Sequence, residues 1–124
     1  MKEEVKRWIK QAERDLITAG NNLKSKDYYA ASFWAQQAAD KGLKAYYLKK
    51  FSTVKKIHNL VILAKELNLP KALIDKCDAL NPIYIDTRYP DALLSMPAER
   101  YDEGKSKEDI KSSGELVEWV RKKL

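Results

Sequence analysis

Residues 28–50 read YYAASFWAQQAADKGLKAYYLKK, and the spacing of their small and bulky side chains indicates the architecture of the whole chain. Small side chains recur along it at alternating steps of four and three residues, which is the spacing of one face of an α-helix; they are Ala31, Ala35, Ala38, Gly42 and Ala45. Bulky apolar side chains occupy much of the remaining circumference, as is typical of a helix that is buried on most sides. We therefore predict a central helix from Asp27 to about Lys50, against which neighbouring helices pack closely.

The N-terminal segment predicts a partner for this central helix. Its apolar residues follow the same four-three spacing and form a single stripe, made of Val5, Ile9, Ala12, Leu16, Ala19 and Leu23. We expect a helix from Lys2 to Lys24. Because the polar residues 25–27 then interrupt the pattern, the first two helices should form an antiparallel hairpin, with Asp27 capping the second.

Two shorter helices are predicted after the central one. Ser52 and Thr53 supply capping oxygens ahead of a third helix, Lys55–Leu67. Pro70 suits the first turn of a fourth helix, because that position needs no backbone N–H. The dipeptide at residues 81–82 is Asn-Pro, which stops this helix.

The last helix is predicted to begin after Ser106, with Asp109 three residues on in a capping-box arrangement, and to run to the C-terminus. Before it, residues 81–105 show no sustained period and hold three of the four prolines, but they are too apolar for a free linker. The predicted fold is all-α. It is a five-helix up-and-down bundle in one domain, residues 1–124, with a long ordered loop before the last helix.

Composition excludes several classes of protein. The 124 residues carry 24 Lys and Arg against 18 Asp and Glu, a net charge of +6 that favours encounter with nucleic acid or nucleotides. One His and one Cys leave no metal-ligand motif, so we expect neither a metal site nor a cofactor. Cys77 has no disulfide partner within the chain, and no run is apolar enough for a membrane span. We expect a cytoplasmic protein.

Charged residues on the central helix and the single histidine are the first candidates for a site. Asp40 precedes Lys44 by four residues, the favourable spacing for an ion pair on a helix, and Lys41 lies beside them. On a buried helix these charges either form a structural ion pair or line a ligand groove. His58 either shuttles a proton or contacts a nucleotide, or it only hydrogen-bonds a neighbouring element.

The long loop holds the second group of candidates. Arg88 offers a planar fork for phosphate or carboxylate, and Tyr84 and Tyr89 offer faces on which a base can stack. Asp91 lies in the same run. The alternative is that Arg88 pairs with Asp86 or Asp91 and pins the loop, with the tyrosines serving as packing.

Three segments together resemble the HEPN domain family, whose name stands for higher eukaryotes and prokaryotes nucleotide-binding. They are YYAASFWAQQAADKGLKAYYL at Tyr28–Leu48, HNL at His58–Leu60 and TRYPD at Thr87–Asp91. The run from Gln36 to Ala45 is the most specific part. The resemblance covers nearly the whole chain. It implies a small all-α bundle, usually a homodimer, often produced beside a small nucleotidyltransferase.

Many members of that family are metal-independent RNases that use an Arg followed, after four to six residues, by a His. Here the matching positions after Arg88 are Leu93, Leu94 and Ser95, and those after Arg100 are Lys105, Ser106 and Lys107. His58 has Phe51, Ser52 and Thr53 at the matching upstream positions. The motif is absent, and with it the imidazole that would serve as general acid or base.

The sequence therefore predicts a non-catalytic HEPN protein that binds nucleotide, partners a small nucleotidyltransferase, or does both, as in a toxin–antitoxin module. A homodimer is expected from the resemblance and from three Trp and seven Tyr, more aromatic surface than one small core readily hides. The predicted contacts are Lys41, Lys44, His58, Tyr84, Arg88, Tyr89 and Asp91, with no catalytic residue. The alternatives are an RNase of this family with another acid–base group, such as His58 or Tyr89, and a pure protein-interaction scaffold.

Overall fold

The structure, a computed structural model, describes residues 2–89 and 95–124, and all regular structure in these two ranges is helical. The elements are α1 (Glu3–Lys24), α2 (Tyr28–Phe51), α3 (Leu60–Glu66), α4 (Lys71–Leu80), α5 (Ile83–Asp86), α6 (Pro97–Arg100) and α7 (Glu103–Lys123). The all-α prediction is confirmed, and its five helices correspond to α1, α2, α3, α4 and α7. The single-turn helices α5 and α6 lie inside the stretch that was expected to be an ordered loop.

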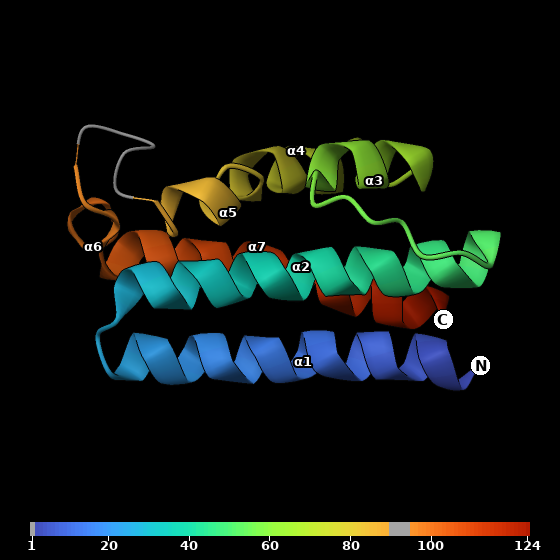
Figure 1. The fold of residues 1–124 in the computed structure, drawn as a ribbon, viewed down its shortest axis with the longest axis horizontal. Helices are drawn as coiled ribbons and strands as arrows, with labels where there is room; N and C mark the ends of the chain where they lie inside the picture. The colour runs from blue at the N-terminus through green and yellow to red at the C-terminus, as the bar shows by residue number, and fades with distance from the viewer. Residues whose placement is uncertain (1, 90–94) are drawn as a thin grey trace.

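Helix α2 occupies the centre of the fold, as its sequence predicts. Figure 1 shows α1 along one side of α2, α7 behind it, and α3, α4 and α5 over the side that faces away from α1. The small residues of α2 allow this close packing: a Cβ added to Gly42 would lie 3.4 Å from Cγ2 of Val117 on α7. All five small residues of the stripe are buried.

Helix α7 starts earlier than the sequence predicts, and the residue predicted to precede it, Ser106, instead joins α7 to α2. Helix α7 begins at Glu103, and its N-cap is Asp102, whose side chain accepts a hydrogen bond from the backbone N–H of Lys105 at 2.8 Å. Ser106 therefore lies inside the helix and is not its cap. Its hydroxyl donates to the carbonyl oxygen of Tyr28 at 2.6 Å, which ties α7 to the first turn of α2.

The predicted third helix, Lys55–Leu67, begins too early. Helix α2 ends at Phe51, and the next residue, Ser52, adopts a left-handed conformation with φ 58°. Helix α3 starts only at Leu60, because the side chain of Asn59 caps it by accepting hydrogen bonds from the N–H groups of Val61 and Ile62, both at 3.1 Å. The capping oxygens of Ser52 and Thr53 are not used for this purpose.

The extended segment 53–59 runs back along α2. The ammonium of Lys55 lies 5.8 Å from the ring centroid of Tyr47, and His58, three residues later, contacts Lys44 one turn earlier on α2. Lys55 also pairs with Glu66 at the far end of α3, at 3.4 Å. Helix α3 consequently runs in the same direction as α2, whereas α1 and α2, and α3 and α4, alternate as in an up-and-down bundle (Figure 1).

The described parts of the stretch before α7 pack on the bundle. The guanidinium of Arg100 donates hydrogen bonds to the backbone carbonyls of Asp86 and Ser95, and so joins the two sides of this stretch. The hydroxyl of Thr87 donates to the carbonyl of Ile83 at 2.7 Å, and Ile83 is buried. Within residues 2–89 and 95–124, no helix combines the length and the apolar character needed to cross a lipid bilayer.

Candidate functional site

Three segments that are far apart in the sequence bring four of the predicted residues together. Lys44 comes from α2, His58 from the extended segment before α3, and Tyr84 and Arg88 from α5 and the turn after it. The imidazole of His58 stacks on the phenol ring of Tyr84, with centroids 4.9 Å apart and 12° between the planes. The guanidinium carbon of Arg88 lies 4.9 Å from the centroid of the same ring.

A fifth residue, Asp40, supports this group from inside the bundle. The residue is only 2% exposed, and its Oδ2 lies 3.0 Å from Nζ of Lys44 and 3.1 Å from Nδ1 of His58. The spacing of Asp40 and Lys44 predicted their ion pair, but nothing local in the sequence indicated that His58 would join it. We call Asp40, Lys44, His58, Tyr84 and Arg88 the His58 cluster.

The His58 cluster is open to solvent on one side. The side chain of His58 is 49% exposed, although its Nδ1 faces the buried carboxylate, and Arg88 is exposed. Arg88 also lies 5.9 Å from the ring centroid of Tyr89, which is exposed. Among residues 2–89 and 95–124 no carboxylate forms an ion pair with Arg88, so the expected pairing with Asp86 is not found; Asp91 lies outside the described residues.

A hollow of about 280 Å³ adjoins the His58 cluster at Arg88. The other side chains around it are small, apolar or aromatic: Tyr29, Thr87, Met96, Pro97 and Ala98. Of these, Tyr29 and Met96 are exposed, as are Ile85 and Tyr89, which lie within three residues of Arg88 in the chain. A positive guanidinium beside an apolar hollow is suited to a ligand that carries both a planar ring and an anionic group.

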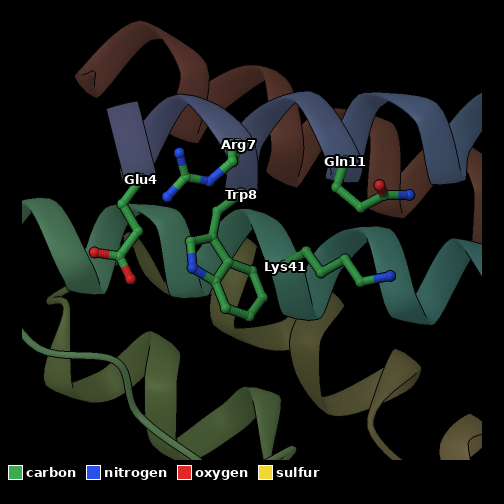
Figure 2. Close-up of a pocket in the computed structure, with 5 residues that line it drawn as sticks. All are labelled: Glu4, Arg7, Trp8, Gln11 and Lys41. Atoms are coloured by element: carbon green, nitrogen blue, oxygen red, sulfur yellow. The ribbon is translucent and has the colours of Figure 1, made fainter. Parts of the chain in front are cut away.

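Lys41 does not belong to the His58 cluster, contrary to the expected common groove. Its ammonium lies 2.5 Å from Oδ2 of the buried Asp15 on α1 and 5.7 Å from the centroid of a Trp34 ring. It lines a separate hollow of about 320 Å³ between α1 and α2, together with Glu4, Arg7, Trp8 and Gln11 (Figure 2). Lys41 therefore forms an ion pair with Asp15 in place of Asp40, and it also borders this separate hollow.

Other ionisable groups offer no additional chemistry. Cys77 is fully buried, and burial raises the pKa of its thiol to about 12, which keeps it protonated and unreactive. Burial and the nearby Asp86 and Asp109 carboxylates raise the pKa of Tyr101 to about 12. In the part of the chain that the structure describes, no group of three His, Cys, Asp or Glu side chains is arranged to hold a metal ion.

The chain is similar to two solved structures over nearly its whole length. It shares 30% identity with TT1696 from Thermus thermophilus, with a TM-score of 0.94 and coverage of 99% of this chain and 100% of that one. It shares 33% identity with ST0689, an archaeal HEPN homologue, with a TM-score of 0.84 and coverage of 99% and 98%. No curated protein matches. A family model of the HEPN domain matches residues 5–123, and the chain belongs to the HEPN domain family.

Proposed function

We propose that this HEPN protein binds a nucleotide at the His58 cluster. The observation that carries the proposal is that the guanidinium of Arg88 lies beside two aromatic rings, 4.9 Å from the centroid of Tyr84, which stacks on His58, and 5.9 Å from that of the exposed Tyr89. Aromatic faces bind bases by stacking, and a guanidinium fork binds phosphate through paired hydrogen bonds. The net charge of +6 increases the rate of encounter with such anions.

In this proposal the residues of the cluster have different roles. Arg88 contacts the phosphate, since it is exposed and has no ion-pair partner in the described ranges. Tyr89 and the apolar hollow beside Arg88 hold the base. Lys44 is buried and already paired with Asp40, so it acts through the local potential and does not contact the ligand directly.

Titration calorimetry with ATP, GTP and short single-stranded RNA tests this proposal. Replacement Arg88→Ala should lower the affinity at least about tenfold, because a charge-assisted hydrogen bond contributes about 1.5–3 kcal/mol. Arg14→Ala removes an exposed arginine from α1 and serves as the matched control, with affinity unchanged. If the unmodified chain gave flat titrations with all three ligands, it would bind no nucleotide, and the interpretation as a protein-interaction scaffold would stand. Equal affinity of the Arg88→Ala and Arg14→Ala variants would show that Arg88 does not contact the ligand.

The second part of the proposal is a cytoplasmic homodimer that partners a small nucleotidyltransferase, as in a toxin–antitoxin module. The exposed apolar side chains beside the His58 cluster, Tyr29, Ile85, Tyr89 and Met96, supply a surface suited to a protein contact. Affinity purification from the source organism should recover a nucleotidyltransferase in stoichiometric amount, and light scattering at micromolar concentration should give twice the chain mass. Recovery of the chain alone, as a monomer, would contradict this part.

A second candidate function is RNA cleavage without the family's usual histidine, and the Asp40–His58 contact at 3.1 Å favours it. An aspartate behind a half-exposed histidine supports acid–base chemistry. In that reaction Nε2 of His58 takes the proton of a ribose 2′-hydroxyl, the 2′-oxygen bonds to the adjacent phosphorus, and the 5′-oxygen leaves with a proton from water. Cleavage that disappears in His58→Ala would support this function, and cleavage that persists there would indicate a contaminating nuclease.

A further inference from the structure

Asp40 is a buried carboxylate with few partners. Its Oδ2 faces both Nζ of Lys44, at 3.0 Å, and Nδ1 of His58, at 3.1 Å. Its Oδ1 is also buried and accepts no hydrogen bond within the described residues. Because a buried carboxylate needs compensation by charge and by hydrogen bonds, the donors that reach Oδ2 decide whether Asp40 is tolerated where it lies.

The contact between Asp40 and His58 determines where the ring proton is. The carboxylate oxygen is only an acceptor, and a neutral imidazole has one donor nitrogen and one acceptor nitrogen. If Nδ1 were the acceptor, two lone pairs would face each other at 3.1 Å. The repulsion disappears when Nδ1 carries the hydrogen and donates it to Oδ2. We infer that Asp40 is a positioning residue that holds His58 in its Nδ1–H tautomer.

Lys44 is the group that competes with this arrangement. Its ammonium lies 3.3 Å from Nδ1 of His58, so a hydrogen bond in the opposite sense, from Lys44 to an unprotonated Nδ1, is within reach. The shorter distance, 3.0 Å, is from the Lys44 ammonium to Oδ2 of Asp40. A bond from Lys44 to the carboxylate satisfies the buried charge, and it leaves Nδ1 free to donate to the same oxygen.

The tautomer decides what the site offers to a ligand. With Nδ1 turned toward Asp40, Nε2 points away from that carboxylate on a side chain that is 49% exposed, and in a neutral ring protonated on Nδ1 it is an acceptor. This step rests on the proposed nucleotide site and limits the groups that a ligand can place there. The group at His58 is a hydrogen-bond donor, such as a hydroxyl, while the anionic group lies at Arg88. The stacked Tyr84 ring fixes the plane of the imidazole and hence the direction of Nε2.

Imidazole nitrogen NMR of the full-length chain tests the inference directly. His58 is the single histidine, so a sample labelled with ¹⁵N-histidine gives one assignable ring. Spectra are recorded at increasing alkaline pH until they no longer change, so that the ring is observed in its neutral form. We expect Nδ1 to give the signal of a protonated nitrogen and Nε2 that of an unprotonated one, the reverse of free histidine in water. A ring protonated on Nε2 would overturn the inference, and this measurement needs no variant.

Substitution then identifies the responsible residue. Asp40→Asn should move the spectrum toward the Nε2–H form, because an amide can turn either its oxygen or its NH₂ toward the ring. Asp15→Asn is the matched control, since Asp15 is equally buried and also pairs with a lysine of α2, Lys41; it should leave the spectrum unchanged. Lys44→Met should also keep the Nδ1–H form. An unchanged tautomer in Asp40→Asn would show that Asp40 does not set it.

Nucleotide titration separates this inference from the proposed function. If the unmodified chain binds, Asp40→Asn should weaken binding about tenfold, the equivalent of one hydrogen bond lost at His58, while Asp15→Asn does not. If the unmodified chain binds no nucleotide, the proposed function fails, and the ring spectrum still decides the role of Asp40. Equal binding by Asp40→Asn and Asp15→Asn would contradict a positioning role for Asp40 in the site.

Discussion

His58 and Tyr84 stack nearly parallel, with ring centroids 4.9 Å apart and an angle of 12° between the planes. The two residues come from different elements: His58 precedes α3, and Tyr84 lies in the single-turn helix α5. The stack therefore joins the extended segment to α5, with Arg88 beside the Tyr84 ring and Asp40 in contact with His58. Aromatic pairs of this kind contribute about 0.5–1.5 kcal/mol beyond the area they bury.

The first prediction concerns the loss of the Tyr84 ring. Tyr84→Ala should weaken nucleotide binding and lower the free energy of unfolding by about 1–3 kcal/mol, because both the stack on His58 and the contact with Arg88 are lost. Tyr84→Phe retains the ring and should leave both quantities nearly unchanged. Calorimetry and urea denaturation measure them. A phenylalanine variant as weak as the alanine variant would show that the hydroxyl, and not the ring face, is what the site uses.

The second prediction concerns the N-cap of α3. The cap residue, Asn59, directly follows His58, and its hydrogen bonds hold this part of the chain in place. Oδ1 of Asn59 accepts from the N–H groups of Val61 and Ile62, and Oδ1 of Asn81 accepts from the N–H of Leu60 at 2.9 Å. Asn59→Ala should destabilise the fold by about 1–2 kcal/mol in urea denaturation. Asn59→Asp retains the acceptor and should recover most of the loss. An aspartate variant as unstable as the alanine variant would contradict this prediction, because Asp keeps the oxygen that accepts from Val61, from Ile62 and, at 3.3 Å, from Nδ2 of Asn81.

Periodicity predicted the packing of the long helices because burial there follows from side-chain size alone. The stripe that includes Ala38 and Gly42 is buried in the structure, and Val5 and Ile9 of α1 are buried as expected. The fold class follows from these two stripes. A helix end, in contrast, depends on which polar side chain reaches the free N–H groups, and Ser52, Thr53 and Asn59 are all plausible caps in the sequence.

The His58 cluster could be predicted only as a set of residue types. Lys44, His58, Tyr84 and Arg88 were expected to contact a ligand, and the structure brings these four together. These residues are close together because segment 53–59 runs back along α2. The chain turns at Ser52, which has a left-handed backbone conformation, and no periodic pattern in the sequence indicates this turn. Lys41 lies apart from these four residues because its partner, Asp15, is on another helix, and sequence spacing does not reveal such contacts.

The glycines of the long helices give a third prediction. A Cβ added to Gly20 or to Gly114 would meet no atom within 4 Å, so Gly20→Ala and Gly114→Ala should each raise the free energy of unfolding by about 1 kcal/mol. Gly42 is different, because its added Cβ would already lie 3.4 Å from Val117. Gly42→Leu should separate α2 from α7 and cost about 1–3 kcal/mol. Urea denaturation of the three variants checks the contrast, which a stable Gly42→Leu variant would contradict.

The fourth prediction concerns Asp109, which is buried on α7 and has one carboxylate oxygen, Oδ2, without a hydrogen-bond partner in the described residues. Burial raises the pKa of this carboxyl above its ordinary value of 3.8, although the hydrogen bond from Lys105 acts in the opposite direction. A carboxyl whose pKa is higher in the folded state binds its proton more tightly when the chain is folded. Its contribution to stability is therefore complete below pH 3.8 and is lost as the pH rises through the folded-state pKa.

Asp109→Asn should accordingly raise the melting temperature at about pH 7, far above 3.8, and the gain should disappear at about pH 2.5, well below 3.8, where the carboxyl binds its proton in both states. Asp75→Asn removes an exposed aspartate paired with Lys71 and is the control, with little change at either pH. Thermal melts of the unmodified chain and the two variants at both pH values show whether the substitution raises or lowers the melting temperature. A lower melting temperature for Asp109→Asn at about pH 7 would mean that the ion pair with Lys105, at 2.8 Å, outweighs the cost of burial.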